Sequence, residues 1–247
     1  MSWIKKCLQQ FSESPYKTNL SNLRIDLEGK SWWSSIKGSL SRDEPTKLVS
    51  QLRWSTIGYH HNWDTKEYSE VDKSPVPNEV EFLCPIIFMW RRLIQTRNFK
   101  AEAGIVNYYP PGTTLSPHTD YSEPNKEAPL LSFSFGRSGI FLIGSHNKET
   151  TPTPIFLHHG DVMIMSENSR LCYHAVPRIM SDEDIKNTAV HSCFNAFLSH
   201  WNNVLKELEA NKSNEMASTL LTYDDLLAIL NYIKEIRINF NVRQVHG

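Results

Sequence analysis

Residues 103–120 read AGIVNYYPPGTTLSPHTD, and this stretch decides the fold class. It opens with a run of β-branched and aromatic residues, which is typical of a short strand. The tripeptide PPG at 110–112 predicts a turn, because proline restricts φ and glycine admits a positive φ. A second strand is then expected to carry His118 and Asp120, two positions apart. Because side chains alternate along a strand, we expect both of them to point to the same face.

The same strand-and-turn pattern continues toward the C-terminus. Further β-rich runs are LLSFSFG at 130–136, GIFLIG at 139–144, PIFLHHGDVMIM at 154–165 and LCYHAVP at 171–177. Many short strands at this spacing predict an all-β sandwich or jelly roll. IRINFNVRQV at 236–245 predicts one more strand, which must pair back into the sheet to be stable.

The segments around these strands are predicted to be mainly helical, apart from one hairpin. Apolar residues recur every three or four positions over 78–99, which predicts an amphipathic helix despite Pro85. We expect three regions: an N-terminal helical extension at 1–50, a hairpin with a supporting helix at 51–100, and a core at 101–247 that carries a helical insert at about 181–235.

Composition excludes several classes of protein. The chain has 26 Lys and Arg against 27 Asp and Glu, so it is not a protein that coats nucleic acid by bulk charge. The apolar stretch Leu83–Trp90 is far short of the ~20 residues that span a bilayer, so we expect no membrane insertion. The four cysteines are scattered, which indicates a reducing compartment. We expect a monomer in the nucleus and cytoplasm, with the mitochondrion as an alternative location.

A candidate metal site comes from three residues. His118 and Asp120 gain a third partner in His174, which lies on another predicted strand. Two imidazoles and one carboxylate form the facial triad that leaves coordination positions open on Fe(II), although the same ligands also suit zinc. A second pair, His159 and Asp161, straddles a glycine in a predicted turn. There the aspartate is expected to cap the turn.

The last predicted strand bears a second polar set. Strict alternation places Arg237, Asn239, Asn241 and Arg243 on one face. This face is either a solvated outer surface or an inward surface whose guanidiniums bind two carboxylates. A dicarboxylate with a chelating keto group would fill two open metal positions and anchor its ends on arginine, which favours iron over zinc.

These motifs together resemble the AlkB family of Fe(II)/2-oxoglutarate dioxygenases, and within it the eukaryotic AlkB homologue 1 branch. The motifs that carry the resemblance are LRWSTIGYHHNWD, KAEAGIVNYY, NYYPPGTTLSPHTD, LLSFSFG, HGDVMIM, SRLCYHAVPR and RINFNVRQV. The resemblance covers roughly residues 51–180 and 236–245. It implies an α+β protein with a double-stranded β-helix (jelly-roll) catalytic core and flanking helices, in which 51–100 includes a substrate-recognition lid.

The resemblance also implies roles for individual residues. His118, Asp120 and His174 would hold Fe(II). The implied 2-oxoglutarate site consists of Asn107, Tyr109, Arg237, Asn239 and Arg243. Of the two arginines, the first would bind the distal carboxylate and the second the end near the metal. The implied reaction consumes O2 and 2-oxoglutarate and oxidises a C–H bond, and an oxidised N-methyl group leaves as formaldehyde.

The substrate is predicted less directly. A methylated base of tRNA or DNA would be held against an aromatic ring, for which Trp54 and Tyr59 are the candidates, with Trp63 nearby. Ser122 stands where repair members of the family have an acidic residue that contacts the base. This departure leaves a protein substrate, such as a histone, as an alternative. A third hypothesis is an abasic-site DNA lyase that forms a Schiff base, with Lys66 as the candidate amine.

Overall fold

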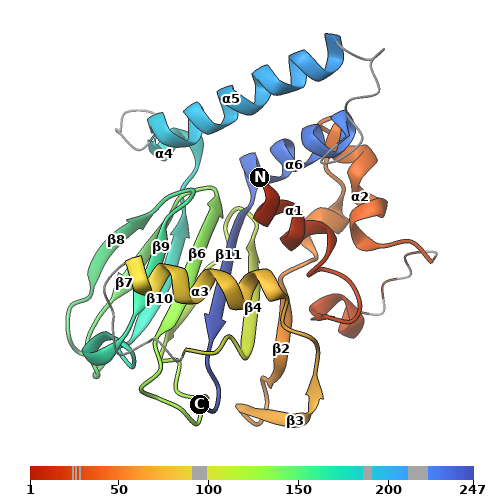
Figure 1. The fold of residues 1–247 in the computed structure, drawn as a ribbon. Helices are drawn as coiled ribbons and strands as arrows, with labels where there is room; N and C mark the ends of the chain where they lie inside the picture. The colour runs from red at the N-terminus through yellow and green to blue at the C-terminus, as the bar shows by residue number, and fades with distance from the viewer. Residues whose placement is uncertain (24, 26, 28, 91–98, 186–190, 211–221) are drawn as a thin grey trace.

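The computed structural model describes residues 1–247 except 24, 26, 28, 91–98, 186–190 and 211–221. Its centre consists of two antiparallel sheets (Figure 1). The larger sheet has the order β1-β2-β4-β11-β6-β9, with β3 beside β2, and the smaller one has the order β5-β10-β7-β8. The strands of the larger sheet are β1 (Lys17–Thr18), β2 (Trp54–Asn62), β3 (Glu67–Lys73), β4 (Ala103–Tyr109), β6 (Leu130–Gly136), β9 (Val162–Met165) and β11 (Arg237–Arg243). Those of the smaller sheet are β5 (Leu115–His118), β7 (Gly139–Ile143), β8 (Thr153–Leu157) and β10 (His174–Ile179).

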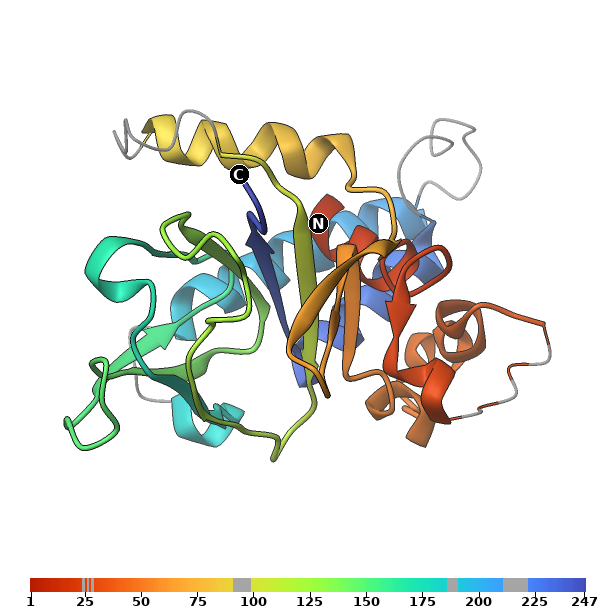
Figure 2. The same cartoon turned by 90° about the horizontal axis from the view of Figure 1, so that it is seen from below.

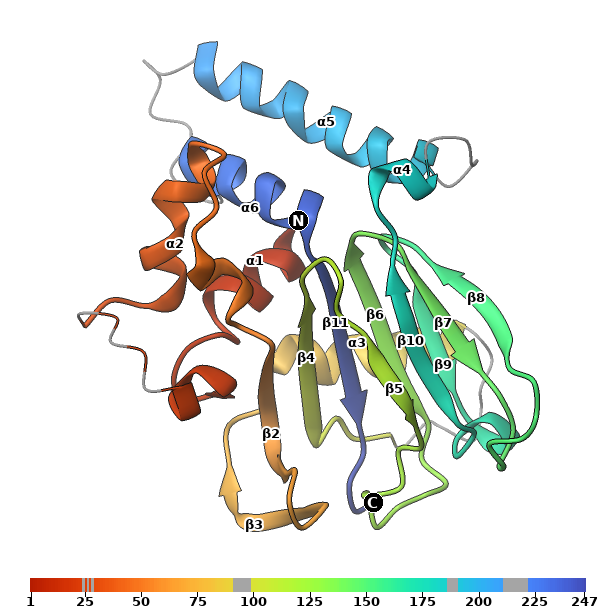
Figure 3. The ribbon, with the colours of Figure 1, turned by 180° about the vertical axis from the view of Figure 1, so that it is seen from behind.

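This topology is the predicted jelly roll with flanking helices. Each β-rich run recognised in the sequence forms a strand, except that 154–165 forms two, β8 and β9, in different sheets. The hairpin expected near residue 60 is the β2–β3 pair. The chain alternates between the sheets after residue 103, so strands distant in sequence become neighbours. Figure 3 shows β2, β4, β11 and β6 side by side. The fold class predicted from the strand pattern is therefore confirmed.

Strand β11 lies in the middle of the larger sheet, paired with β4 on one side and β6 on the other. Its residues Ile238, Phe240 and Val242 are buried in the main hydrophobic cluster, on the outer face of the sheet. Because side chains alternate, the polar residues of β11 point the other way, toward the space between the sheets. The strand is thus buried on both faces, and the solvated-face alternative is wrong.

The helices lie outside the two sheets. They are α1 (Ser2–Gln9), α2 (Trp32–Ser41), α3 (Asn78–Trp90), α4 (Asp182–Ile185), α5 (His191–Ala210) and α6 (Tyr223–Glu235), with 3-10 turns at Asn19–Leu23, Lys47–Ser50 and Glu167–Ser169. Helices α1, α2, α3, α5 and α6 bury side chains in the main hydrophobic cluster on the outer face of the larger sheet. Seen from below, α3 runs along one side of the sheets (Figure 2). The helix predicted over 78–99 is confirmed up to Trp90, and 91–98 lie outside the described residues. Within the described part of the chain, none of the helices has the length and apolar character of a membrane span.

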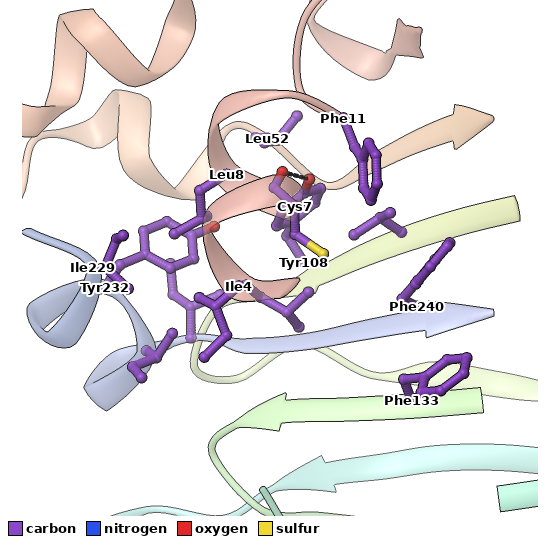
Figure 4. Close-up of a cluster of buried hydrophobic side chains, with 14 of the residues drawn as sticks. Ile4, Cys7, Leu8, Phe11, Leu52, Tyr108, Phe133, Ile229, Tyr232 and Phe240 are labelled. Carbon is purple, nitrogen blue, oxygen red and sulfur yellow. Dashed lines mark hydrogen bonds between the residues drawn. The ribbon is translucent and has the colours of Figure 1, made fainter. Parts of the chain in front are cut away.

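The N-terminal region packs into the same core as the sheet. The side chains of Ile4, Cys7, Leu8 and Phe11 in and after α1 are at most 1% exposed (Figure 4). The hydroxyl of Tyr108, on β4, donates a hydrogen bond to the carbonyl of Cys7 at 2.6 Å. Residues 1–50 therefore belong to the hydrophobic core that supports the central strands.

The helical insert joins this core through α6. Thr222 caps the N-terminus of α6 by accepting a hydrogen bond from the backbone of Asp225. The ring of Tyr232 meets Trp32 of α2 edge-on, with centroids 5.9 Å apart. Asn231 also donates to the carbonyl of Leu40 at 2.8 Å. The insert thus connects the last strand to the N-terminal helices.

The burial of α1 leads to a test of its contribution to stability. Replacing Leu8 with alanine should lower the free energy of unfolding by about 2–5 kcal/mol, because it leaves a cavity under the sheet. Urea denaturation followed by circular dichroism measures this change. The matched control is Ser2→Ala, on the exposed side of the same helix. Equal stability of the two variants would show that α1 does not support the core.

Candidate metal and co-substrate site

A cavity of about 310 Å³ lies between the two sheets. It is lined by side chains from the inner faces of β4, β5, β6, β10 and β11, together with the β2–β3 hairpin. The cavity brings together most of the residues singled out from sequence: Lys66, Asn107, Tyr109, His118, Asp120, Ser122, His174, Arg237, Asn239 and Arg243. Trp54 and Tyr59 do not line it.

The two histidines meet because β5 and β10 are neighbours. His118 ends β5 and His174 begins β10, and the two residues are paired across the antiparallel ladder. Their rings lie 4.3 Å apart, centroid to centroid. The Asp120 carboxylate completes the group, with Oδ1 3.9 Å from Nε2 of His118 and Oδ2 3.6 Å from Nε2 of His174. One ligand atom from each residue thus lies within 4.8 Å of the others.

The hydrogen bonds of the imidazoles suit metal binding. Nδ1 of His118 lies 2.9 Å from the carbonyl of Ser116, and Nδ1 of His174 lies 3.1 Å from the carbonyl of Cys172. A carbonyl only accepts, so each Nδ1 carries the proton and each Nε2 keeps its lone pair for a metal. The donor set therefore fits a divalent cation, with nitrogen and carboxylate ligands that suit Fe(II).

One detail of the sequence prediction is wrong. Strand β5 ends at His118, so Asp120 lies in the loop beyond the strand and not on its face. Its backbone is held instead by Arg170, whose Nη1 donates to the carbonyl of Asp120 at 2.6 Å. The position of the Asp120 carboxylate thus depends on a contact with Arg170, which is distant in sequence, and not on alternation along a strand.

Charge keeps the metal ligands in the required protonation state. Burial by itself would raise the pKa of the Asp120 carboxyl, but Arg243 and His174 outweigh burial and hold that pKa below its usual range. Nη2 of Arg243 donates to Oδ1 of Asp120 at 2.9 Å. Burial also lowers the pKa of His174, which favours the neutral imidazole. The site therefore offers an ionised carboxylate and a neutral nitrogen ligand near pH 7.

Arg237 is a buried cation at the inner wall of the cavity. Its guanidinium donates to Ser134 Oγ at 2.7 Å and to the carbonyls of Arg137 and Leu157 at 3.2 and 3.3 Å. No carboxylate among the described residues forms a salt bridge with it. Burial lowers the pKa of Arg237 to about 10, so the group stays charged at neutral pH. A buried guanidinium with neutral partners is a fitting receptor for a ligand carboxylate.

The amides and serines beside Arg237 form the rest of the polar wall. Asn239 donates to Ser132 Oγ at 2.7 Å and is 3.5 Å from Asn107. Ser132 and Ser134 were not singled out from sequence, although their alternation in LLSFSFG indicates a common inward face. Burial raises the pKa of Tyr109 to about 12, which keeps a neutral hydroxyl at the cavity wall.

Other aromatic residues line the cavity where Trp54 and Tyr59 were expected. Trp63, at the turn of the hairpin, lines the cavity and is 40% exposed. Trp54 packs behind it, with ring centroids 5.7 Å apart. The hydroxyl of Tyr59 donates to Glu70 at 2.8 Å, outside the cavity. Tyr121, 55% exposed, is a further aromatic residue of the lining.

The second histidine and aspartate pair, His159 and Asp161, stabilises a turn and does not belong to the cavity. Asp161 accepts a hydrogen bond from the backbone of His158 at 2.7 Å, so it caps the turn as predicted. Nδ1 of His159 accepts from the backbone of Gly136 at 2.9 Å. Neither Asp161 nor His159 lines the cavity.

Comparison with known proteins bears directly on this site. A family model described as the 2OG-Fe(II) oxygenase superfamily matches residues 2–243. The chain belongs to this superfamily. The inward polar face of β11 and the histidine–aspartate cluster are thus found in a 2OG-Fe(II) oxygenase, in agreement with the family resemblance inferred from the motifs.

Individual relatives agree with this assignment. The 2OG-Fe(II) oxygenase described here is 37% identical over 248 residues to human "Nucleic acid dioxygenase ALKBH1", covering 98% of this chain and 60% of that protein. It is 38% identical over 186 residues to "tRNA demethylase abh1" of Schizosaccharomyces pombe, covering 69% of this chain and 61% of that protein. The chain thus spans about 60% of the length of these relatives. The solved structure titled "The structure of OsALKBH1" shares the fold, with a TM-score of 0.52, 18% identity and coverage of 78% of each chain.

Measurements of metal affinity can distinguish the roles of the two histidine and aspartate pairs. Asp120→Asn should weaken binding of Mn(II) by at least about 10-fold, because it removes a ligand charge. Asp161→Ala should keep the wild-type Mn(II) affinity and lose about 1 kcal/mol of stability with its turn hydrogen bond. Isothermal titration and chemical denaturation measure the two effects. An equal loss of Mn(II) binding in both variants would contradict this assignment of the ligands.

Proposed function

We propose that this chain is an Fe(II)- and 2-oxoglutarate-dependent dioxygenase that demethylates bases in nucleic acid. The observation that carries the proposal is one cavity that holds both the His118–Asp120–His174 cluster and the buried guanidinium of Arg237. A metal-binding group and a carboxylate receptor in one cavity match a co-substrate with a chelating end and a distal carboxylate. The printed names of the relatives, a nucleic acid dioxygenase and a tRNA demethylase, support the choice of substrate class.

Each group of residues has a part in this reaction. His118, Asp120 and His174 would hold Fe(II), and Arg237 with Ser134 would hold the distal carboxylate of 2-oxoglutarate. When bound, the metal with 2-oxoglutarate and O2 supplies the oxidising chemistry for a C–H bond. Arg243 lines the same cavity and donates to Asp120, so it lies beside the position that the co-substrate end near the metal would take.

The overall reaction balances in atoms and electrons. 2-Oxoglutarate, O2 and an N-methyl group give succinate, CO2 and an N-hydroxymethyl group, which then releases formaldehyde and leaves N–H. One oxygen atom of O2 enters succinate and the other enters the methyl group. Apolar side chains between the polar walls, including Leu130, Phe141 and Leu157, reduce access of water to the reacting atoms.

The entrance of the cavity suits a nucleobase. Trp63 and Tyr121 expose aromatic rings there, and such rings stack on unpaired bases at about 1–3 kcal/mol per base. Lys66 adds a cation at the same entrance, where it would attract a phosphate. Because the net charge of the chain is −1, these local contacts would replace a broad basic surface.

A substrate panel tests the proposed function. With Fe(II), 2-oxoglutarate and O2, the protein should release formaldehyde and succinate in equal amounts from methylated tRNA or methylated DNA. Unmethylated strands should give no formaldehyde, and His118→Ala should give neither product because it removes a metal ligand. Formaldehyde release from methylated histone peptides alone would overturn the nucleic-acid substrate and favour a protein dioxygenase.

Lys66 favours a second candidate function, cleavage at abasic sites, because it lines the same cavity and carries an amine. The amine would attack the aldehyde of the opened sugar and lose water to form a Schiff base, which borohydride reduces to a stable adduct. Wild-type protein should then be trapped on abasic DNA. Lys66→Arg should not, because a guanidinium keeps the charge but cannot form the Schiff base. The control Lys73→Ala removes a lysine of the same hairpin that lies over the Tyr59 ring, outside the cavity, and it should be trapped normally. An adduct that persists in Lys66→Arg would exclude this amine.

A further inference from the structure

Next to the metal ligands lies a buried cluster of four charges, two of each sign. It consists of Asp120, Glu123, Arg170 and Arg243, whose residues are 9%, 0%, 2% and 6% exposed. Asp120 is a candidate metal ligand, whereas Glu123 does not line the cavity and has no part in the function proposed above. A carboxylate without any exposed surface requires compensation by hydrogen bonds and opposite charge.

Glu123 accepts hydrogen bonds from two guanidiniums, and one of them, that of Arg243, also binds Asp120. Its Oε1 accepts from Nη1 of Arg243 at 2.6 Å, and its Oε2 accepts from Nη2 of Arg170 at 3.0 Å. The remaining Nη2 of Arg243 reaches Oδ1 of Asp120 at 2.9 Å. Arg243 therefore gives one nitrogen to each carboxylate, although its planar fork would suit both oxygens of a single carboxylate.

The bond from Arg243 determines which carboxylate oxygen of Asp120 is left for a metal. Oδ1 is engaged by Arg243, whereas Oδ2 accepts no hydrogen bond from any described residue and lies 3.6 Å from Nε2 of His174. Arg170 fixes the backbone of the same aspartate, through its carbonyl, at 2.6 Å. Both guanidiniums that hold Asp120 are themselves held by Glu123.

We propose that Glu123 is a positioning residue of the metal centre. By holding Arg243 and Arg170, it keeps Arg243 on a single oxygen of Asp120 and leaves the other oxygen for the metal. Without the Glu123 charge, the fork of Arg243 is free to take both oxygens of Asp120, in competition with the metal. This inference rests on the proposed function in that it assumes a metal at His118, Asp120 and His174.

The same carboxylate also connects the metal centre to the β2–β3 hairpin. The hydroxyl of Tyr68, on β3, donates to Oε1 of Glu123 at 2.9 Å. Tyr68 packs against His61, with ring centroids 5.1 Å apart, and His61 meets Trp63 at 4.7 Å. The same Tyr68 hydroxyl lies 3.5 Å from Nη1 of Arg243. Tyr68→Phe removes these two contacts of the hydroxyl and leaves the bonds between Glu123 and the two arginines, which makes it a useful comparison.

The test measures binding of Mn(II) alone to the metal-free full chain, by isothermal titration and by the electron paramagnetic resonance spectrum of the bound ion. Glu123→Gln keeps the shape and removes the charge, so it should weaken Mn(II) binding by about 10- to 100-fold and change the spectrum. Tyr68→Phe keeps the bonds of Glu123 to Arg170 and Arg243 and should bind Mn(II) with wild-type affinity. The control Asp225→Asn removes a partly buried carboxylate of α6 that is paired with Lys37 and should also bind normally.

Each outcome decides the inference. Wild-type Mn(II) affinity and spectrum in a folded Glu123→Gln variant would overturn it, as would an equal loss in Tyr68→Phe. If Glu123→Gln does not fold, Glu123→Asp is measured instead. It keeps the charge but shortens the reach to Arg243, and unchanged Mn(II) binding in that variant would overturn the inference too. A wild-type chain that binds no Mn(II) would instead contradict the proposed function, so the two failures are distinguishable.

Discussion

The structure depends on burying several charges between two sheets. Moving a charge out of water costs several kcal/mol unless hydrogen bonds and an opposite charge compensate it. Inside this jelly roll, Asp120, Glu123, Arg170 and Arg243 compensate one another in a connected network. Arg237 has only neutral partners among the described residues, so it is the buried cation for which a carboxylate ligand would supply the missing charge. The need to compensate buried charge thus explains two features. The charges beside the metal ligands compensate one another, and the charge of Arg237 can accept a carboxylate ligand.

Strand β11 links this network to the rest of the fold. Its inner face supplies both arginines, and its outer face packs in the cluster that contains Leu8 of α1, Phe88 of α3 and Tyr232 of α6. Helices distant in sequence therefore stabilise the strand on which the polar wall is built. This arrangement gives the N-terminal region and the helical insert a role in the site without a contact to any ligand. It also explains why a short strand can hold charged side chains on one face, since its other face contributes to the main core.

In the proposed function, oxidation and substrate selection would depend on different parts of the molecule. The histidines and arginines come from the rigid sheets, whereas the aromatic residues of the entrance come from the β2–β3 hairpin and the loop after β5. In the hairpin, Trp54 and His61 both pack against Trp63, so the exposed ring of Trp63 is supported. Such support reduces the entropy lost when a base stacks on the ring. Changes in the hairpin could therefore alter the substrate while the oxidising site stays the same.

Local periodicity and motif spacing let the sequence by itself predict the strands, the jelly-roll class, the common face of Arg237 and Arg243, and the His118–Asp120–His174 cluster. Each of these depends on alternation or on motif spacing, which are properties of short segments. Only the tertiary structure decided that Asp120 lies beyond its strand, that Trp63 and not Trp54 lines the cavity, and that α1 belongs to the core. It also decided the place of Glu123, which sequence could not distinguish from a surface acid. Those features arise from contacts between residues dozens of positions apart, and no pattern within one segment reports which distant charge or ring will pack against it.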